Sequence, residues 1–260
     1  HEQKKSYIVI NMCGEKGSKQ SIERVPKGTK IINIPAKRHP IDLVYAEIIL
    51  GIIQGNDQKL HIREEDIMVF LDHDHVNLLN HSFDAVDLIP AADVNGFACM
   101  HQPRCSSHCM ARVQPTVMHQ PHMWGLFTVP EIHPKHNVTL GEWYVQTLGL
   151  EIPKILVPVC YGRSFAIKRK QLSSRHNPSF WQHLIAILED DDNNNDDNVR
   201  NAYYTERSWA AILSQSVPPD IANALLHRTR LILYPPFDGL DITVQDWEIE
   251  MQGMLLWPPL

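Results

Sequence analysis

Two acidic residues, Asp72 and Asp74, follow directly on the apolar segment 66–71 (DIMVFL). That segment predicts a strand buried on both faces, as in the middle of a sheet covered by helices. Alternate residues of an extended chain point the same way, so the two carboxylates can face one ligand at the carboxyl edge of a sheet. Hard carboxylates suit Mg²⁺ or Mn²⁺, ions that neutralise a pyrophosphate leaving group. The pair therefore predicts a metal-assisted nucleotide-sugar site, and a solvated turn with two acids is the alternative.

The elements that must position these acids alternate in type. Strands are predicted at 7–12 and 30–35, and apolar residues of 41–54 recur at the three- and four-residue steps of one helix face. Asp42 lies in the first turn of that helix, where a carboxylate favours the helix dipole. The order strand, helix, strand predicts an α/β sheet with parallel neighbours.

The middle segment of the chain, 91–135, is rich in His, Pro, Cys and Met and has no clean period, which predicts a long binding loop. The acidic run 189–197 (EDDDNNNDD) is too polar to pack and predicts a disordered surface loop. The remaining predicted elements are strands at 154–160 and 230–233, and helices at 140–148, 180–188, 203–213 and 221–227.

The composition excludes several classes of protein. The 260 residues carry 24 basic and 30 acidic side chains, a formal charge of −6, and the acidic run accounts for that excess. The charges of the rest of the chain therefore cancel, and such a chain lacks the extended basic surface that binding to nucleic acid requires. No segment approaches the ~20 apolar residues of a membrane span, and no signal peptide is evident. We therefore expect a cytoplasmic location. Because the chain begins at His rather than Met, the Golgi lumen is the alternative if an N-terminal anchor was removed.

Five cysteines, an odd number without a framework spacing, predict mostly reduced thiols. Several of the cysteines share the segment 91–135 with histidines, a combination that can hold Zn²⁺ tetrahedrally. A plain acceptor-facing loop is the alternative. The candidates are Cys99, His101, Cys105, His108, Cys109, His119 and His122, and one set would be Cys105, Cys109, His119 and His122.

Three blocks, 157–172 (VPVCYGRSFAIKRKQL), 178–181 (PSFW) and 204–209 (YTERSW), resemble a fungal-type family of uncharacterised proteins with a glycosyltransferase-like pattern. The resemblance spans roughly residues 66–213 and is similar in layout to the wider GT-A glycosyltransferases. It implies a single α/β domain, 1–260, with a GT-A-like (Rossmann-like) mixed sheet flanked by helices. Residues 1–90 would form the nucleotide-binding half, 91–213 the acceptor and catalytic half, and 214–260 a C-terminal extension.

The resemblance also implies site residues. Asp72 and Asp74 match the D-x-D that holds the metal and the donor, and Glu206 matches the general base of inverting enzymes. Such a base takes the proton of an acceptor hydroxyl as the hydroxyl attacks the anomeric carbon. A surface acid paired with Arg207 or Arg200 is the alternative for Glu206.

Two further residues follow from the resemblance. Gly162 would let the backbone pass close to the donor sugar, and His227 resembles the histidine that completes the metal shell in many GT-A enzymes. An ordinary turn glycine and a core or surface histidine are the alternatives.

The ends of the first two strands offer candidates for the nucleotide. They are Asn11 and Cys13 after the first strand, and Lys37 and Arg38 after the second. Lys and Arg there could steady the diphosphate, although a solvated charge cluster is the alternative. The predicted function is transfer of a sugar from a nucleotide sugar, a UDP-sugar, to a glycan hydroxyl with Mn²⁺ or Mg²⁺ and inversion. The alternative is a non-catalytic glycan- or protein-binding module with a structural zinc.

Overall fold

The computed structural model describes residues 6–11, 27–34, 40–55, 62–72, 85–99, 117–119, 138–154, 156–160, 163–193, 198–214 and 219. The strands within these ranges are β1 (Tyr7–Asn11), β2 (Lys30–Asn33), β3 (Ile67–Leu71), β4 (Phe97–Cys99), β5 (Val117–His119), β6 (Val157–Val159) and β7 (Phe165–Lys168). The helices are α2 (Ile41–Ile53), α4 (Ala85–Asn95), α6 (Leu140–Leu148), α7 (Arg169–Arg175), α8 (Pro178–Asn193) and α9 (Asn198–Leu213).

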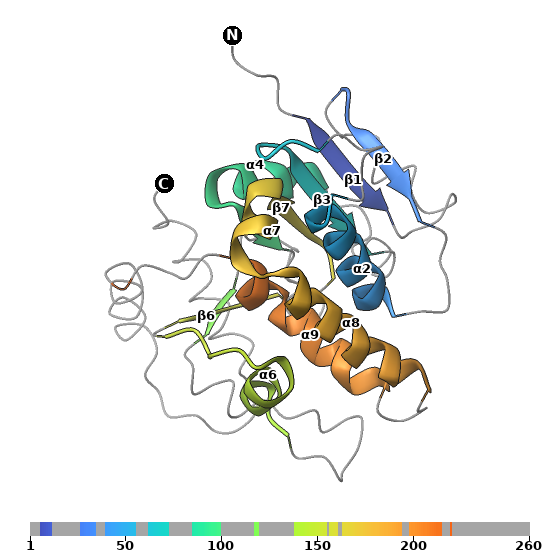
Figure 1. The fold of residues 1–260 in the computed structure, drawn as a ribbon. Coiled ribbons are helices and arrows are strands. Elements are labelled where there is room, and N and C mark those ends of the chain that lie inside the picture. Colours follow the sequence, from blue (N-terminus) through green and yellow to red (C-terminus); the bar gives the residue numbers. More distant parts are fainter. Residues whose placement is uncertain are drawn as a thin grey trace, which may run out of the picture.

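Five of the strands form one mixed sheet in the order β2-β1-β3-β7-β4 (Figure 1). β1 pairs in parallel with β2 on one side and β3 on the other, which confirms the predicted parallel neighbours. β7 runs antiparallel between β3 and β4, and β5 and β6 form a separate antiparallel pair. The α/β class and the mixed sheet are thus confirmed. The chain leaves β1 to one side for β2 and later to the other side for β3, so the switch point of the sheet lies between β1 and β3.

Helices cover both faces of this sheet. On one face, alternate strand residues such as Ile8, Met68 and Phe70 join a core cluster with α2, α6, α8 and α9. On the other face, Val9 and Val69 pack with residues of α4, which lies across the sheet from α8 and α9 (Figure 1). All five residues of β3 are buried, as predicted for a central strand. In the part of the chain that the structure describes, no helix has both the length and the apolar content that crossing a bilayer requires.

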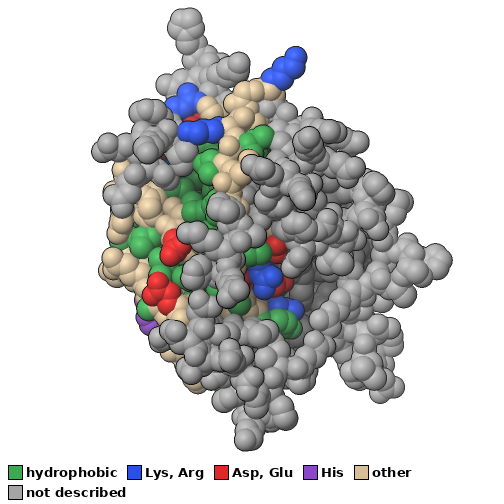
Figure 2. All heavy atoms as spheres, turned by 90° about the vertical axis from the view of Figure 1, so that its right-hand side faces the viewer, with side chains coloured by type: hydrophobic (Ala, Val, Ile, Leu, Met, Phe, Trp, Pro, Cys, Tyr) green, Lys and Arg blue, Asp and Glu red, His purple; other side chains and the backbone are tan. Residues whose placement is uncertain are grey.

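The edge strand β2 is more exposed than the strands inside the sheet. Seen from the side of β2 and α2, the surface carries a band of hydrophobic side chains with basic and acidic groups around it (Figure 2). Edge position alone does not cause this exposure, because β4 at the other edge of the sheet is buried.

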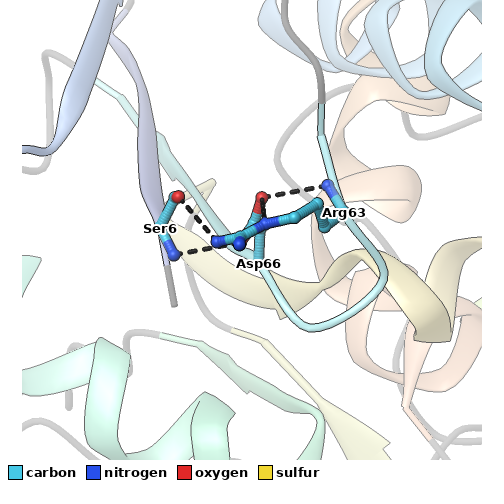
Figure 3. Close-up of polar contacts among 3 residues, drawn as sticks. All are labelled: Ser6, Arg63 and Asp66. Carbon is cyan, nitrogen blue, oxygen red and sulfur yellow. Dashed lines mark hydrogen bonds and ion pairs between the residues drawn. The ribbon is translucent and has the colours of Figure 1, made fainter. Parts of the chain in front are cut away.

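A polar cluster fixes the starts of β1 and β3 (Figure 3). Asp66 Oδ1 accepts hydrogen bonds from the Ser6 backbone N–H at 2.9 Å and from Arg63 Nη2 at 3.0 Å. Asp66 Oδ2 accepts from the Arg63 backbone N–H at 2.9 Å. Burial alone would raise the Asp66 pKa, but these hydrogen bonds and the Arg63 charge outweigh burial and lower it. The cluster therefore sets the mutual register of the parallel pair at the edge opposite to Asp72.

The prediction of an irregular segment 91–135 is wrong at its start and at strand β5, which pairs with β6. Helix α4 continues through Asn95 and strand β4 follows. Pro90 lies inside α4, and this residue together with the low periodicity concealed the helix from sequence reasoning. The buried side chains of Leu88 and Ala92 supply the packing that offsets the proline.

The prediction of disorder across 189–197 is also wrong in part, because α8 continues to Asn193. The side-chain Oδ1 of Asn177 caps the start of this helix by accepting from the Phe180 N–H at 3.0 Å. Trp181, Leu184 and Leu188 are fully buried along the helix, so packing outweighs the unfavourable placement of acids near its C-terminal end. The helix predicted at 203–213 starts earlier, at Asn198, and the strand predicted at 154–160 is limited to Val157–Val159.

The prediction that the thiols are mostly reduced is wrong for two cysteines, because Cys99 and Cys160 form a disulfide. The pairing was hidden because no short spacing links the two residues, whose sequence separation is 61. The elements predicted at 221–227 and 230–233 lie outside the described residues.

Candidate functional site

Asp72 and Arg163 meet where β3 ends and β7 begins. The antiparallel register pairs Phe70 with Phe165, and its continuation by two residues places Asp72 opposite Arg163. The Asp72 backbone N–H donates to the hydroxyl of the buried Ser164 at 3.0 Å, which ties the two strand ends together. The side chains then form an ion pair, with 3.8 Å between Arg163 Nη1 and Asp72 Oδ2.

Arg163 also contacts two carboxylates from the helices on that face. Its Nη2 lies 3.4 Å from Glu206 Oε2 on α9, and its Nε donates to Asp42 Oδ2 on α2 at 2.9 Å. The other oxygen of Asp42 accepts from Trp209 Nε1 at 2.7 Å. One guanidinium thus joins three acids that come from α2, the end of β3 and α9.

The burial of these groups differs in a way that matters for chemistry. The Asp42 side chain is 0% exposed and that of Asp72 1%, whereas the Glu206 side chain keeps 17% exposure and that of Arg163 26%. Glu206 is therefore the carboxylate of the group that an incoming ligand can reach most readily.

Electrostatics follow from this burial. Burial raises the pKa of Glu206 above its ordinary value, the charges of Arg163 and Arg207 oppose the shift, and Asp42 and Asp72 add to it. Burial likewise raises the pKa of Asp42, against the charge of Arg163 and the N–H donor of Trp209. The Asp42 charge is the largest reason that the pKa of Arg163 is raised, so the guanidinium stays protonated.

An aromatic cluster supports the four charged residues. Each has a ring on the same face of its own element, three residues away on a helix or two along a strand. The pairs are Asp42 with Tyr45, Asp72 with Phe70, Arg163 with Phe165, and Glu206 with Trp209. The rings touch one another, with centroid distances of 4.9 Å for Tyr45–Phe70, 4.6 Å for Phe70–Phe165 and 5.4 Å for Phe165–Trp209. The packed rings hold their backbones rigidly and thereby fix where the charges stand.

Of the residues selected from the sequence, the structure brings Asp72 and Glu206 together at Arg163. Asn11 ends β1 in register with Leu71, so its backbone lies at the same edge of the sheet as Asp72. The described residues do not include Cys13, Lys37, Arg38, Asp74, Gly162 or His227, so these predictions stay untested.

The alternative for Glu206 is a surface acid paired with Arg207 or Arg200; the Arg207 charge does act on Glu206, and the Arg200 side chain is not among those that the structure describes. Arg207 lies with its guanidinium carbon 3.2 Å from the Tyr203 ring centroid and donates to the Tyr203 carbonyl. The side-chain ion pair of Glu206 is with Arg163.

Sequence reasoning missed Asp42 and Arg163. It assigned Asp42 to the helix dipole and passed over Arg163 as part of a turn. The sequence does contain one signal for these two residues. Each is followed by an aromatic residue on the same face, three positions away on a helix or two along a strand.

The donor atoms of Asp72 and Glu206 are carboxylate oxygens, which fit Mn²⁺ or Mg²⁺. Asp72 Oδ2 and Arg163 Nη1 form an ion pair whose 3.8 Å is longer than a hydrogen bond. Within the described ranges no three His, Cys, Asp or Glu side chains are grouped as metal ligands. For the predicted zinc, the disulfide removes Cys99 as a thiolate ligand, and the side chains of the other candidates are not described.

Comparison with protein-family models, with curated proteins and with solved structures finds no match to this chain.

Proposed function

We propose that the chain is a nucleotide-sugar-dependent glycosyltransferase of GT-A type whose reaction centre lies at Asp72, Arg163 and Glu206. One observation carries the proposal. The two carboxylates chosen from the sequence for different roles, donor binding and proton transfer, contact the two terminal nitrogens of one guanidinium. They stand at the carboxyl edge of the sheet, beside the switch point where ligands of open α/β sheets bind.

In this proposal each residue has a defined task. Glu206 takes the proton of an acceptor hydroxyl, and the oxygen attacks the anomeric carbon of the donor sugar. The bond from that carbon to the diphosphate oxygen breaks, and its electron pair leaves with the nucleoside diphosphate. Attack opposite to the leaving group inverts the anomeric carbon. Asp72, together with the neighbouring Asp74, would hold Mn²⁺ or Mg²⁺, and the ion supplies the positive charge that the leaving diphosphate needs.

The raised Glu206 pKa supports the assignment, because a base whose pKa is moved toward the working pH accepts a proton more effectively. The charge of the group supports it as well. Three carboxylates surround one guanidinium, so the cluster carries an excess of negative charge that favours a cation beside it.

The test is binding and turnover on the purified chain. UDP with Mn²⁺ should raise the melting temperature, and UDP should be released from at least one donor in a panel of UDP-glucose, UDP-galactose and UDP-N-acetylglucosamine. Asp72→Asn should remove both effects, whereas the exposed control Glu47→Gln on α2 should keep them. A nucleotide that leaves the melting temperature unchanged, together with donor release equal in wild type and Asp72→Asn, would contradict the proposal.

A further inference from the structure

Asp42 uses both of its carboxylate oxygens inside the core. Oδ1 accepts from Trp209 Nε1 at 2.7 Å, and Oδ2 accepts from Arg163 Nε at 2.9 Å. The residue is fully buried, and Trp209 is held by ring contacts with Phe165 and Trp181. The carboxylate therefore has one orientation, fixed by a rigid indole on one side.

That orientation determines where the Arg163 fork points. The guanidinium is planar, so a hydrogen bond that fixes Nε also fixes the directions of Nη1 and Nη2. Those nitrogens are the ones that lie 3.8 Å from Asp72 Oδ2 and 3.4 Å from Glu206 Oε2. Asp42 is thus linked to both Asp72 and Glu206 through the Arg163 guanidinium.

The backbone around Arg163 is fixed as well. Ser164, the next residue, accepts the hydrogen bond from the Asp72 N–H. Cys160, a few residues earlier, is bound by the disulfide to Cys99 in β4. With the backbone held in this way, the contact with Asp42 determines the direction of the Arg163 side chain.

We infer that Asp42 and Arg163 are positioning residues of the proposed reaction: the indole of Trp209 orients Asp42, Asp42 orients the guanidinium, and the guanidinium holds Glu206 and Asp72 in place. The inference rests on the proposed function for the task of Glu206. The chain of contacts from Trp209 to Arg163 can be tested without any turnover.

The contact chain has a spectroscopic signature. The sequence has six tryptophans, so the ¹⁵N spectrum of the labelled chain contains six indole N–H signals, and Trp209→Phe identifies the one that belongs to Trp209. We expect Asp42→Asn and Arg163→Lys each to shift this signal. Arg63→Lys is the matched control, because Arg63 pairs with Asp66 at the opposite end of β3, and it should leave the signal in place.

The positioning role has a kinetic signature. In Asp42→Asn the amide oxygen still accepts from Trp209, but the amide NH₂ faces the Arg163 Nε–H, which then loses its acceptor. Misplacing a catalytic group by about 1 Å can cost ~10²-fold in rate, so kcat for donor cleavage should fall about tenfold or more while KM stays within about twofold. Arg163→Ala should lose as much activity, and added guanidine should restore part of it. Arg63→Lys should change neither constant.

The outcomes separate the two ideas. A wild type that releases UDP, with an unchanged kcat in folded Asp42→Asn and no rescue of Arg163→Ala by guanidine, overturns the positioning role and leaves the proposed function standing. A wild type without turnover contradicts the proposed function. In that case a shifted Trp209 signal in both Asp42→Asn and Arg163→Lys still supports the contact chain, and an unshifted signal refutes it.

Discussion

The disulfide between Cys99 and Cys160 joins the edge strand β4 to the residue that follows β6, and so connects the five-stranded sheet to the small antiparallel pair. Both cysteines are fully buried. The segment that carries Arg163 leaves from this bridge, so the same bond that connects the two sheets anchors one side of the candidate site.

Removing the bridge should destabilise the fold. Closing a loop of this length by a disulfide stabilises a protein by about 2–4 kcal/mol, so Cys160→Ala and Cys99→Ala should each lower the free energy of unfolding by that amount. Urea denaturation followed by tryptophan fluorescence measures the change.

Thiol counting provides the control for this prediction. The chain has five cysteines, and the bridge leaves at most three of them free to react with iodoacetamide in the unfolded, unreduced protein. Mass spectrometry that finds five alkylated cysteines without a reductant would show that the bridge is absent.

Trp209→Phe should lower the free energy of unfolding by more than the loss of buried ring area alone would. The substitution keeps a ring in the aromatic cluster but leaves a buried oxygen of Asp42 without its donor, a loss of about 1–3 kcal/mol in the free energy of unfolding. Trp181→Phe is the matched control, because Trp181 stacks on Trp209 and its indole N–H has no hydrogen-bond partner among the described residues. Equal costs for the two variants would argue against the Asp42 hydrogen bond.

Much of the fold could be predicted because its signals are local. The runs at 7–12, 30–35 and 66–71 became β1, β2 and β3, and the periodic segment 41–54 became α2. Helix α6 has a capping box, with Thr139 and Glu142 at the spacing that favours a helix start, and its predicted bounds are confirmed. The misjudged elements are α4 and the end of α8, residues 189–193, where tertiary packing overrides a proline and a run of acids.

The site could be predicted only in part, for a similar reason. Asp72 follows a strand at an edge where ligands bind, and Glu206 lies in a block that resembles a known pattern, so both could be selected from the sequence. Asp42 and Arg163 are joined across 121 residues, and Asp42 and Trp209 across 167. The spacing of Asp42 and Tyr45 indicates a shared helix face, but it does not identify the distant residues against which the Asp42 carboxylate is buried.

The Asp66 cluster should make the free energy of unfolding depend on pH in the acid range. Folding lowers the pKa of Asp66 below its ordinary value of 3.8, so its contribution is complete above that pH and is lost as the pH falls through the lower value of the folded state. Asp66→Asn keeps one acceptor oxygen and turns an NH₂ toward the other backbone N–H donor, of Ser6 or of Arg63, which loses its acceptor, so the free energy of unfolding should fall by about 1–3 kcal/mol at pH 6. The difference from wild type should shrink as the pH falls below 3.8. Urea denaturation over this pH range measures it.

A surface ion pair serves as the comparison for Asp66. Asp93 and Lys168 lie 3.2 Å apart with partly exposed side chains, and exposed pairs contribute about 0–1 kcal/mol. Asp93→Asn should therefore have a small effect at every pH. A cost for Asp66→Asn that is as small, or that does not change with pH, would show that the cluster does not hold the starts of β1 and β3.

Glu206→Gln should remove catalysis and spare the fold. Loss of a general base lowers rates by about 10²–10⁴-fold, so kcat for transfer should fall by this factor while the affinity for UDP is kept. Glu47→Gln, an exposed change on α2, is the control for handling and folding. Activity in Glu206→Gln within about twofold of wild type would show that a group other than Glu206 takes the proton of the acceptor hydroxyl.

The central claim, that Asp72 and Glu206 flank one glycosyl-transfer centre, is tested most directly by a crystal structure of the chain soaked with Mn²⁺ and a UDP-sugar. The account predicts an ion bound by Asp72, the diphosphate beside it at the carboxyl ends of β1 and β3, and the anomeric carbon on the side that faces Glu206. Nucleotide density at a different edge of the sheet, or an ion and a sugar that contact neither Asp72 nor Glu206, would contradict it.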